Sequence, residues 1–265
     1  MLTDRSPLRE ANTIKLTILG SGTSVPDGDR NSAGYFVETR DAKIMLDCGA
    51  GTVHALERYD LAWEEMTHLF ISHFHVDHVG ELASLFQAFK YGMPTGRTGT
   101  LTVVGPSGLD RVIDGLRHAF GEKLFSPGFP VRFHLLPPGG HIQIGRTGRL
   151  SVAKTPHTDE SLAVRIDTPN ASLCYTGDTD YCEELSVFFS GADLLISECS
   201  FRERREGVPH LSIRDAAVIA SKAAVRRLIV THFYFDVDEA TLKSQLLNDY
   251  SGEVLIGKDG MRIEI

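Results

Sequence analysis

Residues 72–78 contain a dense group of side chains that bind metal ions. His73, His75 and His78 stand close to Asp77, so three imidazoles and one carboxylate fall within six residues. His73 and His75 are two positions apart and would point the same way from an extended segment. Asp77 and His78 follow where a strand is expected to turn into a helix. Imidazole and carboxylate ligands together suit zinc, iron or manganese, so the segment predicts a metal site.

The alternative is a set of ordinary histidines. A single histidine is more often a surface residue or a hydrogen-bonded core residue than a ligand. The unit H-x-H-x-D-H differs, because four ligand side chains rarely coincide at this spacing. Buried together without a cation, they would all need other polar partners. We therefore interpret the unit as a metal site.

Further ligands are expected at the ends of strands elsewhere in the chain. His157 follows a strand over 150–155, Asp178 follows one over 172–175, and His232 ends one over 228–231. A side chain at the end of a strand can project into a cleft at the edge of the sheet. Asp178 also fits a simple turn residue, so each position is a weaker candidate than the cluster at 73–78.

The elements that must position these residues follow from hydrophobic periodicity and turn residues. Strands are expected at 13–19, 34–38, 43–47, 66–72, 101–104, 131–136, 142–144, 150–155, 162–167, 172–175, 193–197, 228–231, 254–256 and 261–265. Helices are expected at 51–59, 77–91, 106–120, 212–224 and 239–249. Strands come in runs with helices after each run, which favours two packed sheets flanked by helices in one domain over residues 1–265.

Composition limits the class of protein. The chain has 265 residues, 42% of them apolar, and a formal net charge of −8. An acidic total does not favour broad binding to a nucleic-acid backbone, which relies on Lys and Arg. The four cysteines form no C-x-x-C pair, the first residues lack the apolar region of a signal peptide, and no apolar run approaches a membrane span. We expect a cytoplasmic protein with reduced thiols and no membrane partner.

Ordered sequence segments along nearly the whole chain resemble the metallo-β-lactamase fold superfamily, and within it the ribonuclease Z-like phosphodiesterase branch. Besides the histidine unit they are LGSGTSVP at 19–26, RN at 30–31, LDCGAGT at 46–52, GRT at 96–98, GPSGL at 105–109, YTGDT at 175–179, ISE at 196–198, HLS at 210–212 and THF at 231–233. Arg30 and Asn31 fit either a substrate-positioning or a structural role.

The resemblance implies an α/β fold of the four-layer αβ/βα sandwich type, with two mixed β-sheets flanked by helices and two divalent metal ions at one edge. These would be zinc ions, with manganese or iron also compatible. It assigns His73, His75 and His157 to one metal, and Asp77, His78 and His232 to the other. Asp178 would bridge both. It further implies hydrolysis by a hydroxide between the metals, with Asp77 holding the water, His210 as the proton donor and Glu198 orienting His210.

Several features depart from ribonuclease Z. The arm that grips tRNA would lie between His157 and Asp178, which are only 21 positions apart here, and two short strands with a turn use that span. The residues after His232 lack the arginine common in tRNA-processing relatives. A small or cyclic phosphodiester is therefore the favoured substrate, and tRNA 3′ processing the alternative.

Two further alternatives stay open. One is a lactonase or thioesterase that uses the same metal pair. The other is a metal-binding or partner-binding protein without activity. The filled ligand positions argue against a decayed site. The resemblance also implies a homodimer.

Overall fold

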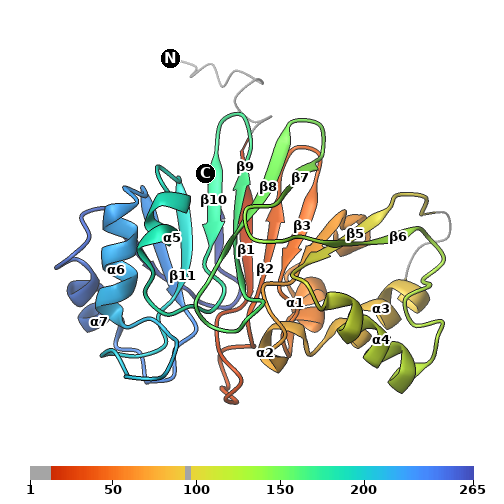
Figure 1. Ribbon diagram of the computed structural model, residues 1–265, viewed down its shortest axis with the longest axis horizontal. Coiled ribbons are helices and arrows are strands. Elements are labelled where there is room, and N and C mark those ends of the chain that lie inside the picture. Colours follow the sequence, from red (N-terminus) through yellow and green to blue (C-terminus); the bar gives the residue numbers. More distant parts are fainter. Residues whose placement is uncertain (1–12, 93–96) are drawn as a thin grey trace.

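The computed structural model describes residues 13–92 and 97–265. Two seven-stranded sheets pack face to face, and helices cover the outer face of each sheet (Figure 1). The layers follow from burial, because the central strands of each sheet are buried on both faces and need a partner on each, whereas strands at the sheet edges stay partly exposed. The expected four-layer αβ/βα sandwich, with two mixed β-sheets flanked by helices, is confirmed.

Both sheets have a parallel half and an antiparallel half. The strands of the first sheet are, in spatial order, β14 (Arg262–Glu264), β1 (Lys15–Gly20), β2 (Gly34–Glu38), β3 (Lys43–Leu46), β4 (His68–Phe70), β5 (Leu101–Gly105) and β6 (Val131–Leu135). Those of the second are β13 (Glu253–Ile256), β12 (Arg227–Thr231), β11 (Leu194–Glu198), β10 (Ser172–Tyr175), β9 (Leu162–Asp167), β8 (Gly148–Lys154) and β7 (His141–Ile144). Strands β3 to β6 are parallel in the first sheet, and β10 to β13 in the second.

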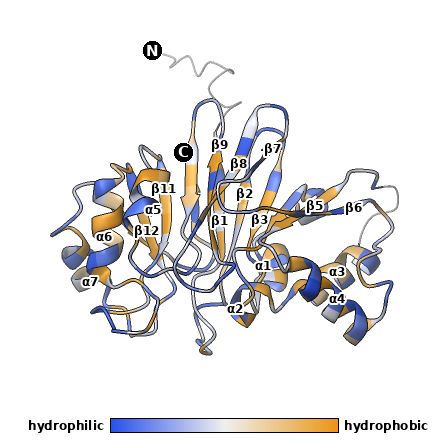
Figure 2. Ribbon diagram, viewed as in Figure 1, coloured by the Kyte–Doolittle hydropathy of each residue, from blue (hydrophilic) through white to orange (hydrophobic). Residues whose placement is uncertain are grey.

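The helices fall into two groups, one on each sheet. They are α1 (Thr52–Arg58), α2 (Val76–Val79), α3 (Leu82–Gly92), α4 (Leu109–Phe120), α5 (Glu183–Phe188), α6 (Ile213–Lys222) and α7 (Glu239–Leu246), with a 3₁₀ turn, η2, at Trp63–Glu65. Helices α1, α3 and α4 share an apolar cluster with the first sheet, and α5, α6 and α7 share one with the second. A third cluster fills the space between the sheets. Figure 2 shows these apolar residues along the strands and on the inner helix faces.

Three helices differ from the sequence-based expectation. The helix expected at 77–91 is broken into α2 and α3, because the N–H of Glu81 donates to the carbonyl of Cys48, 2.9 Å away, and leaves the helical ladder. The helix expected from Pro106 begins at Leu109, since Gly108 adopts a left-handed conformation with φ +98°. Helix α5 was not expected, and its six residues are too short to show periodicity.

Helix α6 confirms its expected start. Ser212 accepts a hydrogen bond from the backbone of Asp215, and the Asp215 carboxylate accepts one from the backbone of Ser212. This reciprocal capping box stabilises the first turn.

The first twelve residues and Gly96 lie outside the described residues. Within the described part of the chain, no helix has the length and apolar character to cross a membrane.

Candidate metal centre

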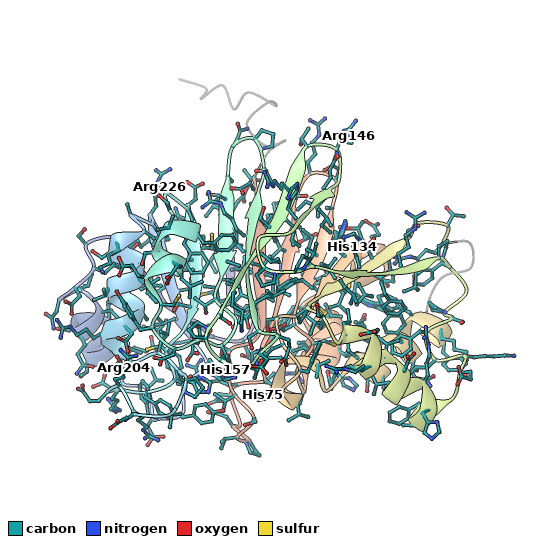
Figure 3. The ribbon with its side chains drawn as sticks, in the orientation of Figure 1. His75, His134, Arg146, His157, Arg204 and Arg226 are labelled. Atoms are coloured by element: carbon teal, nitrogen blue, oxygen red, sulfur yellow. The ribbon has the colours of Figure 1, made fainter. Side chains whose placement is uncertain are left out.

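Four loops at one edge of the sandwich supply the candidate ligands. The loop after β4 carries His73 and His75, and the short helix α2 that follows carries Asp77 and His78. The loops after β8, β10 and β12 carry the other three, His157, Asp178 and His232. Figure 3 shows His75 and His157 together at the lower edge, where these loops meet. Strands β3, β4, β10, β11 and β12 run parallel to neighbours, so their carboxyl ends deliver side chains to a common edge. The structure thus brings together all seven candidate ligands.

These side chains form two groups. In the first group, ligand atoms of His73, His75, His157 and Asp178 all lie within 4.8 Å of one another. The second group joins Asp77, His78 and His232 within the same distance. In the first group, Nε2 of His157 lies 3.0 Å from Nδ1 of His75, so two ring nitrogens converge on one point.

Asp178 lies between the two groups and faces both. Its Oδ2 is 3.7 Å from Nε2 of His73 and 3.7 Å from Nε2 of His157. Its Oδ1 is 3.3 Å from Nε2 of His78 and 3.6 Å from Nε2 of His232. Each carboxylate oxygen therefore points at a different group, which is the arrangement that a bridging ligand requires.

The burial of these atoms tests whether they fit a pair of cations. Nε2 of His73, Nε2 of His78 and Oδ1 of Asp178 are buried and have no hydrogen-bond partner among the described residues. Buried polar atoms nearly always have a partner. All three unpartnered atoms point into the same centre, and a divalent cation in each group would satisfy them. The clustered His and Asp side chains thus fit a dinuclear metal site.

The protonation states are consistent with ligands. Burial would raise the pKa of Asp178, but the charges of His232 and His78 outweigh it and hold that pKa well below its usual range. Burial and the neighbouring His78 lower the pKa of His73. Asp178 is therefore a carboxylate and His73 a neutral imidazole, which are the forms that bind metals.

His78 is held by a buried carboxylate that sequence reasoning missed. Its Nδ1 donates to Oδ2 of Asp47 at 2.7 Å, and the Tyr175 hydroxyl donates to the same oxygen at 2.7 Å. Ser72 donates its N–H to Oδ1 and its hydroxyl to Oδ2. With Nδ1 donating, Nε2 of His78 is left to face Asp178. Asp47 stands in the LDCG segment that follows β3, where the sequence alone does not distinguish it from a turn residue.

His78 differs from His73 in its preferred charge. Burial would lower the pKa of His78, but the charges of Asp178 and Asp47 outweigh burial and raise it. A proton on Nε2 would lie between His78 and Asp178. A cation in the second group would take the place of that proton, so metal binding and proton release are linked at this residue.

The loop at 199–210 is tied to a ligand in each group. The Ser200 hydroxyl accepts from Nδ1 of His232 at 2.9 Å, and the carbonyl of Pro209 accepts from Nδ1 of His157 at 2.9 Å. His232 itself has a positive φ of 63°, and its backbone N–H donates to the carbonyl of Ser21. Both imidazoles are therefore oriented through the nitrogen that faces away from the centre.

His210 and Glu198 lie beside the two groups as a pair. Nδ1 of His210 is 3.0 Å from Oε1 of Glu198 and 4.0 Å from Oδ2 of Asp178. Burial would lower the pKa of His210, but the hydrogen bond and charge of Glu198 raise it above its usual value. Glu198 is fully buried and accepts further hydrogen bonds from Thr179 and Ser200, so its position is fixed.

Of the two roles expected for Arg30 and Asn31, positioning substrate or supporting the structure, their hydrogen bonds fit the structural one. Arg30 donates to the Ser21 hydroxyl and to the carbonyl of Gly257, and the side chain of Asn31 donates to the carbonyl of Leu19. Asp259 accepts from the backbone and the hydroxyl of Ser21. These contacts fix the loop after β1, whose Ser21 carbonyl holds His232.

Comparison with known proteins gives relatives over most of the chain. The family model described as "Beta-lactamase superfamily domain" matches residues 42–233, a range that contains all seven candidate ligands. Ribonuclease Z of Haloferax volcanii is 26% identical over 96% of this chain and 95% of its own length. The uncharacterized protein ML1173 of Mycobacterium leprae is 31% identical over 83% of this chain and 78% of its own.

A solved structure agrees with these relatives. The metallo-β-lactamase fold protein YhfI of Bacillus subtilis superposes with a TM-score of 0.82 at 25% identity, covering 96% of this chain and all of the other. The family model alone spans well over half of the chain. The chain belongs to the metallo-β-lactamase fold superfamily, on its ribonuclease Z-like branch.

Proposed function

We propose that this protein is a metal-dependent hydrolase that cleaves a small or cyclic phosphodiester at a dinuclear centre. The observation that carries the proposal is Asp178, whose two oxygens face the two ligand groups while His210 lies 4.0 Å from one of them. A metal pair beside a proton donor suits hydrolysis of a phosphate ester. The relatives named ribonuclease Z support the same class of reaction.

Each group would hold one ion, with Asp178 shared between them. His73, His75 and His157 would bind one cation, and Asp77, His78 and His232 the other. Divalent ions bound here would supply positive charge that stabilises the transition state. They would also lower the pKa of a bound water towards neutrality. We propose zinc as the native metal, because imidazole and carboxylate ligands with open positions suit it.

Asp77 and His210 are the groups proposed to handle protons. Burial would raise the pKa of Asp77, but the hydrogen bond from His232 and the charge of His78 lower it. Asp77 therefore stays a carboxylate that can orient an attacking water. His210, whose pKa the hydrogen bond and charge of Glu198 raise, would donate a proton to the leaving oxygen. Glu198 acts through His210 as a positioning residue.

The loops support a small substrate. The span between His157 and Asp178 is filled by β9, β10 and the turn that joins them, and the turn closes tightly with the N–H of Thr168 bonded to the carbonyl of Ala171. No room remains there for an arm that would hold a folded RNA. Cleavage of precursor tRNA remains the alternative function, and the assays described next include precursor tRNA as a substrate.

The test combines metal content with substrate preference. Purified protein should hold two divalent ions per chain by mass spectrometry and should hydrolyse bis(p-nitrophenyl) phosphate. Cyclic nucleotides, cyclic sugar phosphates and precursor tRNA then define the substrate class. Turnover of lactones or thioesters without any phosphodiester turnover would overturn the proposal, as would fewer than two ions in fully active protein.

The proposed function also includes an oligomeric state and a cellular location for the protein. We propose a homodimer in the cytoplasm, on the ribonuclease Z-like resemblance and on reduced cysteines. Cys48, Cys174 and Cys199 are buried and unpaired, which fits a reducing compartment. Light scattering coupled to gel filtration tests the dimer, and fractionation of cells tests the location.

A further inference from the structure

An exposed tyrosine stands at the rim of the proposed metal centre. The ring centroid of Tyr234 lies 5.5 Å from that of His232 and 6.0 Å from that of His210. Tyr234 is 37% exposed, although it follows the buried residues His232 and Phe233. Exposed aromatic rings next to a polar centre are the residues that ligands use for apolar contact.

The Tyr234 ring is held in place from two sides. Phe201 stacks on it, with centroids 5.7 Å apart and the planes inclined by 23°. Phe201 is itself buried, and the guanidinium of Arg205 covers its ring at 3.9 Å. The Tyr234 hydroxyl lies 3.4 Å from that of Ser24, on the loop after β1. A ring fixed in this way loses little conformational entropy when a flat group stacks on it.

Two other apolar side chains at the rim are exposed. Val76, between the candidate ligands His75 and Asp77, is 69% exposed, and Val25, next to Ser24, is 58% exposed. Exposed apolar side chains grouped around a polar site indicate a binding surface. The rim around the charged centre is therefore suited to a ligand that joins an anionic group to an apolar one.

The charged residues nearby do not favour a second phosphate site. Arg202 donates to the carbonyl of Asp236 and lies over the Phe235 ring, and Arg204 pairs with Asp180. Glu203 and Glu206 flank Arg204 and Arg205 in the sequence. Positive charge at this rim is thus largely balanced, and the feature left to recognise a substrate is the aromatic face.

We propose that Tyr234 is a specificity-determining residue that stacks on a planar aromatic group of the substrate, such as a nucleobase. The inference rests on the proposed function, because the phosphate of the same molecule would sit at the metal centre. Stacking of a base on an aromatic side chain contributes roughly 5- to 150-fold in affinity. The substrate class is then a nucleotide-type phosphodiester and not a cyclic sugar phosphate.

A pair of ligands that differ only in the base tests the inference. Adenosine 5′-monophosphate and ribose 5-phosphate carry the same phosphate and sugar, and their dissociation constants from the metal-loaded protein are measured by calorimetry. The wild type should bind the first about tenfold more tightly or better. Tyr234→Leu should bind both alike, while Tyr234→Phe should keep the preference, because it keeps the ring. Tyr91→Leu, at an exposed tyrosine on α3, is the matched control and should also keep it.

The outcomes separate this inference from the proposed function. Equal affinities in the wild type, or a preference that survives in Tyr234→Leu, would overturn the stacking role. A preference that depends on Tyr234 in a protein that hydrolyses no phosphodiester would overturn the proposed function alone. Melting temperatures of the three variants, compared with the wild type, show whether a lost preference comes from a damaged fold.

Discussion

His78 and Asp47 form a fully buried pair, with imidazole Nδ1 2.7 Å from carboxylate Oδ2. The pair orients a candidate ligand from behind, and Asp47 itself adopts a positive φ of 57° to reach it. Asp47 also accepts hydrogen bonds from Tyr175 and Ser72. It therefore connects the two sheets through β10 and the loops after β3 and β4.

The first prediction concerns this support. Asp47→Asn keeps the shape of the side chain but removes the charge that sets the His78 proton on Nδ1. Loss of such a partner typically lowers metal affinity by ~10–100-fold. Competition with a chromogenic chelator measures the change. Asp41→Asn removes a surface carboxylate that pairs with Arg146 and should leave metal affinity unaltered; equal affinity in both variants would contradict the role of Asp47.

The second prediction separates the two groups. His75 belongs to the first group only, whereas Asp178 faces both. His75→Ala should therefore reduce metal content from two ions to about one per chain, and Asp178→Ala should reduce it below one. Mass spectrometry of protein dialysed against limited zinc measures both. Two ions retained in Asp178→Ala would show that the carboxylate does not bridge.

The third prediction concerns His210 as a proton donor. His210→Ala should keep both metals but lose ~10²–10⁴-fold in kcat, the usual contribution of a general acid. Metal content and turnover of bis(p-nitrophenyl) phosphate are measured on the same preparation. His118→Ala, on α4, is a control outside the centre. Full activity in His210→Ala would remove this residue from the mechanism.

The fourth prediction is a shift in pH dependence. Glu198 raises the pKa of His210, so Glu198→Gln should lower that pKa. A proton donor acts in its protonated form, and activity falls as pH rises through its pKa. The alkaline limb of kcat/KM should therefore move to lower pH in Glu198→Gln, and metal content should stay at two. A limb that stays in place would assign it to another group.

The fifth prediction is stabilisation by metal. A ligand present at a thousand times its dissociation constant adds about 4 kcal/mol to the free energy of unfolding. In a chain of this size that raises the melting temperature by roughly 10 °C. Scanning fluorimetry with and without a chelator measures the shift at pH 7. The shift should shrink at acidic pH, because protons compete with the cation at His78.

Much of the fold followed from local signals. The helix expected at 212–224 is α6, whose start depends on the capping box between Ser212 and Asp215, two residues close in the sequence. The alternation of apolar residues located the strands, and their grouping in runs indicated two sheets. The break between α2 and α3 was not predictable, because it depends on a hydrogen bond from Glu81 to Cys48, a contact between segments 33 positions apart.

In the candidate site, too, some residues could be predicted from local sequence signals and others depend on contacts between distant segments. The residues at 73–78 could be found from spacing alone, since they are neighbours in the chain. His157, Asp178 and His232 were weaker candidates from their places at strand ends, and their assignment to the two metals came from the family resemblance, because only tertiary structure brings these loops together. Asp47 and Asp259 were missed for a related reason. A buried supporting carboxylate has no pattern in sequence that distinguishes it from a turn residue.

The hairpin turn between β7 and β8 lies at the far edge of the sandwich from the centre. Figure 3 shows Arg146 at this turn, opposite His75 and His157. Arg146 is exposed, and its hydrogen bonds to Asp41 link it to the neighbouring turn between β2 and β3 and not to the ligand loops. This edge can therefore accept a fluorophore, an affinity tag or an inserted domain while the ligand loops stay untouched. A dye attached there would report on assembly or movement in fully functional molecules.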